Sequence, residues 1–400
     1  MNPDLLASRW IRRTTSLALR ARLVAAGQRE RWAAECNLPT VFTKEAAMER
    51  APDRKRVQEF ARKLFGHYTS GMLTMMVDIG HRTGLFEAAA KGAATSQQLA
   101  DRVDLNERYV REWLGAMATG GIMEYDAGSR TFVLPGEHAV CLTGTSSRNL
   151  AANSQVLAML AKRLAAVTAC FKSGGGVPYS EFRPDFTDYM DASWRLLYDG
   201  LLIKGFLPAA KELPERLTGG IRVGDLGCGT GHAINLIAKE YPRSDLVGYD
   251  IAADAIECAR AEAQAMGLSN ARFEVRDVTQ LPPDTRFDLI TSFDAIHDQR
   301  DPAAVLRSAA AALAPDGVYL VVEPRASSRL EENVGNPFGP WMYGVSVLHC
   351  MTVSLAEGGA GLGTAWGEQI ARQFLTEAGF TSVEAVEAPG PQNTIYICRR

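Results

Sequence analysis

The sequence predicts an α/β protein, with a small helical domain in front of a larger domain built on a doubly wound parallel sheet. Two patterns predict this fold class. Before about residue 140, apolar residues recur three and four positions apart, as they do on one face of a helix. From residue 221 onward, short apolar strands alternate with helices of about ten residues, which is typical of parallel β-α units.

Length and composition limit the class of protein. A chain of 400 residues with 46% hydrophobic and 22% charged residues is long enough for two or three domains and apolar enough to bury a core. It contains no stretch of about 18 apolar residues that would span a bilayer. The net charge, 43 − 46 = −3, lacks the basic excess that is typical of nucleic-acid-binding proteins.

The seven cysteines are widely spaced, and no two of them form a CxxC zinc or redox motif. We therefore expect free thiols in a reducing compartment and a cytoplasmic location. Residues 1–50 are interpreted as a disordered N-terminal extension. Five arginines and one acid in its first 28 residues are typical of organellar targeting. Residues 1–47 are thus a targeting segment, a surface arm, or the product of a reading frame that naturally begins at Met48.

Residues 51–145 predict a winged-helix domain, made of helices followed by a small hairpin. The expected elements are a helical period over 57–90, a helix over 107–119, and strands over 122–125 and 131–134. Thr95 and Gln98 have the spacing of a capping box, which opens a further helix. Asn106 is a favourable N-cap for the helix that follows it.

Residues 146–215 are predicted to be a helical linker that contributes to a substrate pocket. Trp194, Leu197 and Tyr198 lie on a helix that faces a pocket or another apolar surface. The α/β domain then covers residues 216–400. Its expected elements are strands at 222–225, 245–250, 272–276, 287–293 and 318–322, separated by helices at 233–240, 254–266 and 302–313.

A glycine-rich turn follows the first of these strands. The strand that contains Asp225 runs into Gly227-Cys228-Gly229-Thr230-Gly231, and a helix begins at about His232. Glycines let the backbone turn tightly and approach a ligand closely. A dinucleotide would require glycine or alanine at the third position of G-x-G-x-x-G, which His232 occupies here. The sequence instead has the pattern Asp-x-Gly-x-Gly-x-Gly.

Acidic residues follow the next three strands. Asp250 lies 250 − 231 = 19 residues after the last glycine, where a carboxylate accepts the ribose hydroxyls of an adenosine ligand. Asp277 follows the third strand, where it would accept a hydrogen bond from an adenine amino group, and Asp294 follows the fourth. These positions share the carboxyl edge of a parallel sheet, where ligands of open α/β folds bind.

The glycine turn and these acids resemble the class I S-adenosylmethionine-dependent methyltransferases over residues 221–400. The resemblance implies a seven-stranded Rossmann-like sheet, whose last two strands form an antiparallel hairpin at 380–386 and 393–398. It also implies S-adenosylmethionine as the cofactor. The expected cofactor-binding residues are Asp225, Gly227, Cys228, Gly229, Gly231, Asp250, Ile251, Asp277, Val278, Phe293 and Asp294.

A narrower resemblance, over residues 55–400, is to a bacterial subgroup that joins a winged helix to this domain. It rests on the segments 105–115, 293–298 and 349–355. The subgroup is often labelled as transcriptional regulators, and it implies a cofactor and a fold but no substrate. We expect an enzyme that transfers the methyl group in line to a small, partly hydrophobic molecule.

A general base is needed only if the methyl acceptor loses a proton, and histidine is the usual base near neutral pH. Of the six histidines, His297 follows the fourth strand. His349 lies in an insertion, residues 325–367, that is well placed to cover the acceptor site. Either residue is the candidate catalytic base, and the alternative for each is a buried structural histidine. We expect no metal, because the acids near His297 have no specific ligand spacing.

The alternative function is a transcriptional regulator that binds DNA and senses S-adenosylmethionine. Residues 54–115 hold ten Lys or Arg and seven acids, 10 − 7 = +3, and three of these cations are adjacent at 54–56. In the helix that would enter the DNA groove, Arg108 and Arg111 alternate with acids and apolar residues. This composition favours a protein interface over a phosphate-binding surface. We therefore expect a homodimer without a nucleic-acid or membrane partner.

Overall fold

The computed structural model describes residues 52–282, 284–390 and 392–400. The extension predicted over residues 1–50, and with it the targeting hypothesis, lies outside these residues. The chain forms two compact units, residues 1–65 and 66–400. In the first unit, the described residues form the beginning of helix α2 (Arg54–Arg82). The domains below belong to the second unit.

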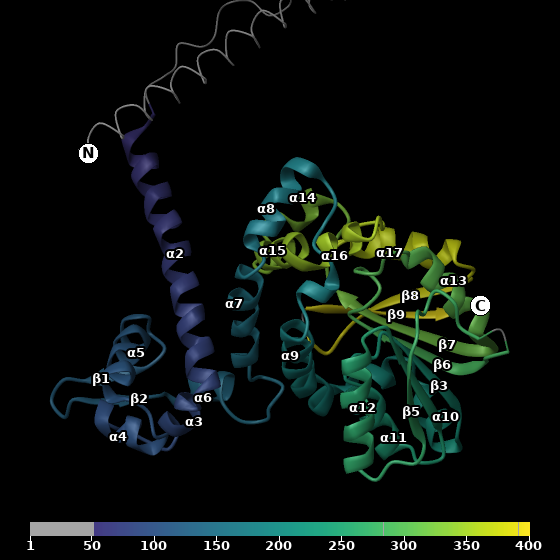
Figure 1. Cartoon of the computed structure of the whole chain (residues 1–400), viewed down its shortest axis with the longest axis horizontal. Helices are drawn as coiled ribbons and strands as arrows, with labels where there is room; N and C mark the ends of the chain where they lie inside the picture. Colours follow the sequence, from purple (N-terminus) through teal and green to yellow (C-terminus); the bar gives the residue numbers. More distant parts are fainter. Residues whose placement is uncertain (1–51, 283, 391) are drawn as a thin grey trace, which may run out of the picture. The chain divides into compact units, whose positions relative to one another are not determined.

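The smaller domain is the predicted winged helix (Figure 1). After α2 come α3 (Leu85–Ala89), α4 (Ser96–Arg102), α5 (Glu107–Thr119), β1 (Glu124–Asp126), β2 (Thr131–Val133) and α6 (Gly136–Leu142). The helical period expected over 57–90 is interrupted at Gly84, whose φ of 70° ends α2 and separates it from α3. The capping box is confirmed, since Gln98 N donates to Thr95 Oγ1 and Thr95 N donates to Gln98 Oε1.

The core of the winged helix is built around the indole of Trp113, on the inner face of α5. The ring centroids of Phe86 and Trp113 lie 5.3 Å apart in an edge-to-face arrangement. Trp113 Nε1 donates a hydrogen bond of 2.8 Å to the Met76 carbonyl oxygen and so attaches α5 to α2. Val110, Leu114 and other buried side chains complete this core, so the apolar face of α5 is turned inward.

Helices connect the winged helix to the sheet. They are η1 (Ala151–Ser154), α7 (Gln155–Ala161), α8 (Leu164–Ser173), η2 (Tyr179–Glu181), α9 (Asp185–Leu201), η3 (Leu202–Phe206), η4 (Leu207–Ala209) and α10 (Leu213–Gly219). Within the described ranges, no single helix has the length and hydropathy needed to cross a membrane. The segments 151–161 and 164–173 pass that test together, but they are bent by 57° and their apolar side chains contribute to a buried cluster.

The larger domain holds the seven-stranded sheet, which confirms the predicted fold class. Its strands, in spatial order, are β5 (Ala271–Val275), β4 (Asp245–Asp250), β3 (Arg222–Leu226), β6 (Phe287–Phe293), β7 (Leu313–Pro324), β9 (Asn393–Arg399) and β8 (Ser382–Glu387). The first five are parallel, and β9 pairs antiparallel with both β7 and β8. Because β3 lies between β4 and β6, strands are added on one side of β3 up to β5 and on its other side from β6 onward. Ligands of doubly wound sheets bind at this point, where the strand order reverses.

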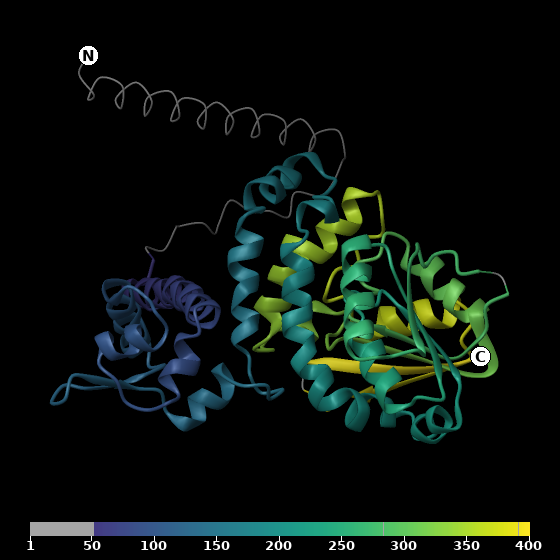
Figure 2. The same ribbon diagram turned by 60° about the horizontal axis from the view of Figure 1, so that its bottom comes forward.

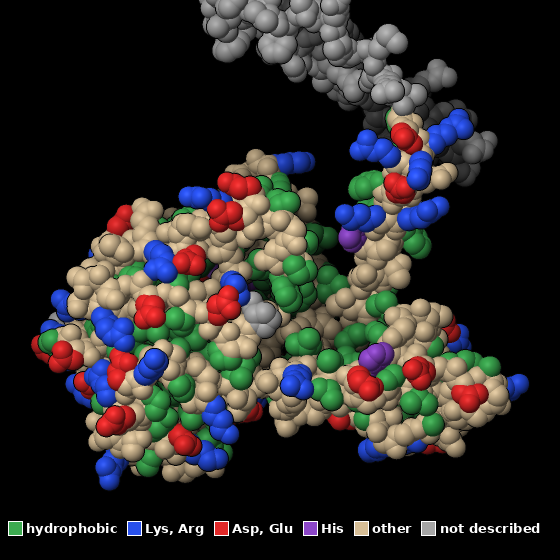
Figure 3. All heavy atoms as spheres, turned by 180° about the vertical axis from the view of Figure 1, so that it is seen from behind, with side chains coloured by type: hydrophobic (Ala, Val, Ile, Leu, Met, Phe, Trp, Pro, Cys, Tyr) green, Lys and Arg blue, Asp and Glu red, His purple; other side chains and the backbone are tan. Residues whose placement is uncertain are grey.

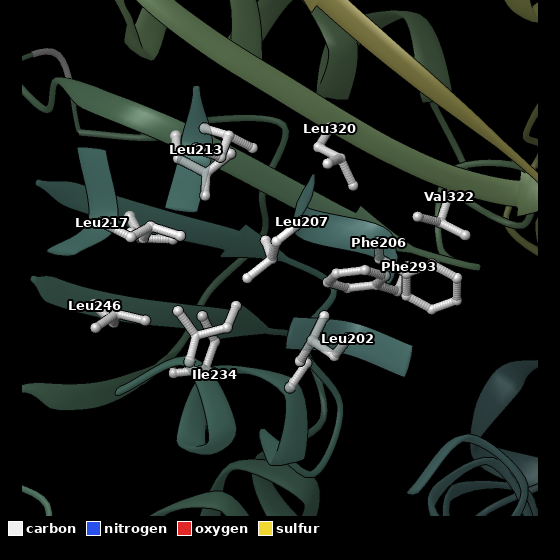
Figure 4. Close-up of a cluster of buried hydrophobic side chains, with 14 of the residues drawn as sticks. Leu202, Phe206, Leu207, Leu213, Leu217, Ile234, Leu246, Phe293, Leu320 and Val322 are labelled. Atoms are coloured by element: carbon white, nitrogen blue, oxygen red, sulfur yellow. The ribbon is translucent and has the colours of Figure 1, made fainter. Parts of the chain in front are cut away.

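Helices cover both faces of the sheet (Figure 2). On one face pack α10, α11 (His232–Glu240) and α12 (Ala253–Ala265), and on the other α13 (Pro302–Ala312) and α17 (Gly367–Glu377). Alternate side chains of β7 point to opposite faces: Leu320 joins the cluster in Figure 4, while Tyr319 joins the cluster behind the sheet. Burial on both faces explains why the central strands are almost entirely apolar.

The insertion between β7 and α17 is helical. It contains α14 (Leu330–Asn333), α15 (Gly339–Val345), η5 (Ser346–Cys350) and α16 (Met351–Ala356). Val345, Leu348 and Val353 pack against buried side chains of α7, α8 and α9. Val177 N also donates a hydrogen bond of 2.9 Å to Thr352 Oγ1. The insertion and the connecting helices therefore form one apolar layer, which we call the roof cluster.

Candidate active site

The glycine turn joins the end of β3 to the start of α11. Gly227, Gly229 and Gly231 have φ values of 77°, 53° and 74°, a region that favours glycine. A Cβ at Gly227 would lie 2.8 Å from the Cβ of Ala295, and one at Gly231 would lie 2.5 Å from that of Ala259. A Cβ at Gly229 would meet nothing within 4 Å. Backbone conformation thus favours glycine at all three positions, packing leaves no room for a side chain at two of them, and the space for a ligand lies over Gly229.

Asp250, at the tip of β4, is joined to the glycine turn. Its Oδ2 accepts a hydrogen bond of 2.8 Å from Gly229 N, and its Oδ1 accepts one of 2.8 Å from Ala252 N. Burial raises the pKa of this carboxyl group above its usual value, and the two N–H donors partly oppose that shift. A carboxylate has about four acceptor positions, so two remain for a ligand.

The other predicted cofactor residues occupy different depths. Asp225 is 2% exposed, and its Oδ1 accepts a hydrogen bond of 2.7 Å from Thr291 Oγ1. Burial raises the pKa of Asp225 to about 7. Val278 and Phe293 belong to the two buried clusters of the sheet, whereas Ile251 is 64% exposed. Ile251 can therefore contact a ligand, while the aspartate lies in the interior of the sheet.

The side chains of Asp277 and Cys228 both make contacts within the protein. Asp277 Oδ1 accepts hydrogen bonds from the backbone N and Oγ1 of Thr279, which stabilises the turn after β5. Asp277 is exposed, so its second oxygen is accessible to a ligand. The Cys228 sulfur would be 2.8 Å from a Cβ on Gly248, so this side chain packs against β4 and only its backbone faces the turn.

Asp294 begins the loop after β6 in an unusual conformation, with φ of 54°. Its Oδ2 accepts a hydrogen bond of 3.2 Å from Trp194 Nε1 of α9, while its Oδ1 is shielded from solvent and has no hydrogen-bond partner in the described part of the chain. Burial raises the pKa of Asp294 to about 6, and the charge of His297 opposes this shift. His297 Nδ1 lies 3.9 Å from this oxygen, too far for a hydrogen bond, so Oδ1 can still accept one from a cationic ligand.

His297 is tied to a carboxylate at the end of β7. Its Nδ1 lies 2.6 Å from Oε2 of Glu323, and Glu323 Oε1 accepts a hydrogen bond of 2.9 Å from Ile296 N. Glu323 is fully buried and His297 is 2% exposed. Burial alone would lower the pKa of His297, but the Glu323 charge and a contact with Cys350 outweigh it and raise the pKa well above the usual value.

Asp294, His297 and Glu323 together form a possible metal site, because one potential ligand atom of each lies within 4.8 Å of the others. However, Nδ1 of His297 and both oxygens of Glu323 already have hydrogen-bond partners in the protein. A histidine whose Nδ1 is held by a carboxylate is the arrangement of a positioned general base. We therefore interpret the group as a His–Glu pair.

His349, the second predicted base, lies in a different environment. It is fully buried in η5, and neither ring nitrogen has a hydrogen-bond partner among the residues that the structure describes. Its ring stacks on Phe186, with centroids 3.4 Å apart and planes 9° apart. Burial lowers the pKa of His349 to about 3, and the charge of His297 adds to this effect. The two histidines therefore differ in charge near neutral pH.

A charged network attaches α9 to the glycine turn. Thr230 Oγ1 donates a hydrogen bond of 2.5 Å to Asp191 of α9. His232 lies between Glu262 of α12, 3.0 Å from Nδ1, and Asp199 of α9, 2.9 Å from Nε2. Burial lowers the pKa of His232, but these two carboxylates outweigh it and the pKa is raised. The network connects the glycine turn to α9, the helix that also carries Phe186 and Trp194.

Sequence comparison agrees with this geometry. Residues 71–144 match the Rv2258c-like winged HTH domain, and residues 217–379 match a methyltransferase domain. The matched region 217–379 extends from the end of α10 to the residues that follow α17. The glycine turn, the acids at the strand tips and the His–Glu pair all lie within it.

Curated relatives of the methyltransferase domain include a release factor glutamine methyltransferase from Agrobacterium fabrum, 32% identical over 147 residues, which are 33% of this chain and 49% of the relative. A trans-aconitate 2-methyltransferase from Variovorax paradoxus is 36% identical over 119 residues, 30% of this chain and 42% of the relative. The chain thus matches less than half of the length of these relatives.

Solved structures extend the likeness to both domains. A structure described as a putative O-methyltransferase from Nostoc punctiforme has a TM-score of 0.66 and 18% identity, and covers 85% of this chain and 98% of its own. Human N-acetylserotonin methyltransferase, in complex with SAM, has a TM-score of 0.63 and 15% identity, and covers 88% and 99%. At this identity, the likeness shows that the fold is shared.

Several functional candidates of the methyltransferase domain and its roof were not singled out by sequence reasoning. Glu323 ends an apolar strand with an acid, the same signal that identified Asp250 and Asp294, and could have been found. No signal of that kind identifies Cys350 or Phe186, because their proximity to the two histidines arises only from the fold.

Proposed function

We propose that the chain transfers a methyl group from S-adenosylmethionine to a hydroxyl or thiol of a small, partly hydrophobic molecule. The observation that carries this proposal is the buried His297–Glu323 pair, at the same sheet edge as the glycine turn of a methyltransferase domain. A methyl-group donor at the turn and a proton acceptor beside it are the two requirements for methylating such a group.

The residues at the turn fit the cofactor. We propose that Asp250 accepts hydrogen bonds from the ribose hydroxyls with its two remaining acceptor positions, while Ile251 contacts the adenosine. Asp277 would accept from the adenine amino group with its second oxygen. Oδ1 of Asp294, which has no hydrogen-bond partner among the described residues, suits the cofactor ammonium group. When bound, the cofactor supplies an electrophilic methyl group on a sulfonium and a neutral leaving group.

In the proposed mechanism, the protein orients the acceptor, excludes water and removes a proton. Positioning alone contributes at most about 7–11 kcal/mol to lowering the barrier. Glu323 holds Nδ1 of His297, so the proton of the acceptor goes to Nε2. Because the Glu323 charge keeps the pKa of His297 raised, the active, neutral form grows as the pH rises. The rate should therefore increase with pH through an apparent pKa above about 6.5.

Binding of the cofactor can be tested without an acceptor. Asp250→Ala removes the charged acceptor of the ribose hydroxyls and should weaken S-adenosylmethionine binding by about 1.5–3 kcal/mol in calorimetry. The matched control is Asp245→Ala, at the opposite end of the same strand, which pairs with Arg272 and should bind as the parent does. Unchanged affinity in the Asp250 variant, or tight binding of NAD to the parent, would contradict the proposal.

We further propose that the winged helix mediates formation of a homodimer. Tyr68, Met72 and Ile79 lie along one side of α2 and are 60%, 62% and 43% exposed, and Tyr109 of α5 is 80% exposed. Arg108 and Arg111, the two cations of α5, form ion pairs with acids one turn away, so this helix offers little free positive charge to DNA phosphates. Lys and Arg side chains also stand out along the beginning of α2 (Figure 3), in the first unit of the chain.

Light scattering distinguishes the proposed homodimer from a monomer. We expect a dimer for the parent, and a shift to monomer when Tyr68→Asp and Met72→Asp introduce charge into the apolar side of α2. Sequence-selective and salt-sensitive binding to DNA would instead support the regulator.

A further inference from the structure

The two ring nitrogens of His349 form an unexplained polar site in the roof cluster. The side chain is fully buried, and neither Nδ1 nor Nε2 has a hydrogen-bond partner within the described ranges. A neutral imidazole carries one donor and one acceptor, and leaving both unpaired in the interior is costly. Buried polar groups without a partner in the protein are commonly satisfied by a ligand or by water.

Flat side chains surround this site. Phe186 stacks on the His349 ring at 3.4 Å, and the edge of Phe182 approaches it at a centroid distance of 4.7 Å. Tyr179 lies edge-on at 6.0 Å, and Tyr189 lies 6.0 Å from Phe186. Aromatic walls of this kind fit a planar, apolar ligand, because offset-stacked and edge-to-face contacts need flat partners.

The site lies next to the proposed base. Cys350, which follows His349 in η5, lies close enough to His297 to influence its pKa, and Ser354 of the next helix donates a hydrogen bond of 2.9 Å to the carbonyl oxygen of Gln299, two residues after His297. The charge of His297 also acts on the His349 ring. A small molecule whose hydroxyl meets His297 would therefore extend its other end toward His349. Its ring would lie among the aromatic side chains.

The charges around the site disfavour an anionic ligand. Burial, with the nearby charges of Asp250 and Asp298, raises the pKa of Tyr179 to about 12. Burial of Asp298 raises the pKa of its carboxyl group to about 7, so this group exchanges protons near neutral pH. The aromatic cluster thus borders several carboxylates. The two nearby cations are each paired with an acid: His297 with Glu323, and Arg183, which lies 5.9 Å from the centre of the Tyr179 ring, with Asp254. A carboxylate on the acceptor would face like charges.

We propose that His349 determines specificity by hydrogen-bonding a second polar group of a flat, uncharged acceptor, whose first hydroxyl is held at His297. The inference rests on the proposed methyltransferase function and assigns the acceptor class. An acceptor that lacks the second group leaves the imidazole unpaired and binds more weakly. Sites built to pair a polar group discriminate strongly against ligands without it.

Binding of simple aromatic probes tests this assignment. Phenol, the three dihydroxybenzenes and benzoate are titrated into the protein with S-adenosylhomocysteine present, and their affinities are measured by calorimetry or ligand-observed NMR. We expect at least one dihydroxybenzene to bind ten-fold or more tightly than phenol, and benzoate to bind more weakly than phenol. No binding of any dihydroxybenzene at 10 mM, equal binding of diol and phenol, or tighter binding of benzoate would overturn the proposal.

Variants of His349 separate recognition from structure. His349→Phe keeps a flat ring for stacking but removes both nitrogens, so it should reduce the preference for the diol to less than three-fold and leave phenol binding unchanged. His349→Gln restores hydrogen-bonding groups and should recover part of the preference. Since His349→Phe removes an unpaired buried group, its Tm should equal or exceed that of the parent.

The exposed residue His67 provides the matched control, because His67→Phe makes the same chemical change outside the site. A preference that His349→Phe leaves intact, or a Tm well below that of the parent, would refute the specificity role in favour of a structural one. If the parent protein did not bind S-adenosylmethionine or S-adenosylhomocysteine, the proposed function itself would be refuted.

Discussion

Replacing Glu323 by glutamine tests the His297–Glu323 pair without knowledge of the acceptor. The hydrogen bond between Nδ1 and Oε2 is 2.6 Å long, and both side chains are buried. Hydrogen bonds to charged groups contribute about 1.5–3 kcal/mol. One pKa unit corresponds to about 1.36 kcal/mol, so the pKa of His297 should fall by about one to two units in Glu323→Gln.

The same change predicts how stability depends on pH. Because the folded-state pKa of His297 is raised, the pair stabilises the fold fully below the unfolded pKa of about 6.5. This contribution is lost as the pH rises through the folded-state pKa. Glu323→Gln should therefore lower the free energy of unfolding by about 1.5–3 kcal/mol at pH 6, and the difference from the parent should narrow at higher pH.

The assay is an NMR titration of the imidazole carbons, in which His297→Gln assigns the signal among six histidines. Glu377→Gln is the control, since this glutamate accepts a hydrogen bond from Gln373 on the surface of α17 and contacts no histidine in the described structure. A His297 signal that titrates near pH 6.5 in the parent, or at the same pH in parent and Glu323→Gln, would refute the pairing argument.

Two further predictions concern the glycine turn. Gly231→Ala places a Cβ 2.5 Å from that of Ala259 at a φ of 74°, so the Tm should fall by several degrees and cofactor binding should weaken. Gly267→Ala is the control for backbone conformation alone, because Gly267 has a φ of 68° but open space around it. His232 has a raised pKa because two carboxylates outweigh its burial, so His232→Gln should destabilise the protein below pH 6.5. Denaturant titrations should show the difference shrinking as the pH rises, and a loss independent of pH would contradict this prediction.

Much of the sheet edge that is proposed to bind the cofactor was predictable, because the features that place its residues are local in sequence. An apolar strand followed by glycines or an acid identifies a strand tip, and the alternation with helices requires the tips of parallel strands to share one edge. The bounds of β4 and β6 agree with the strands predicted at 245–250 and 287–293. The helix break at Gly84 was missed, because an apolar helical period continues on both sides of it.

The charge states of the two histidines were decided by tertiary structure. From the sequence, His297 and His349 were equivalent candidates for the base. His297 follows a strand tip, and His349 lies in the insertion expected to cover that tip. Their difference depends on Glu323, which is 26 residues from His297, and on Phe186, which comes from the connecting helices and stacks on His349. A pKa depends on burial and on charges within a few ångströms, and the fold determines both. The sequence by itself therefore determined the fold and the set of strand tips that share one sheet edge, while only tertiary packing distinguished a charged, paired histidine from a neutral, unpaired one.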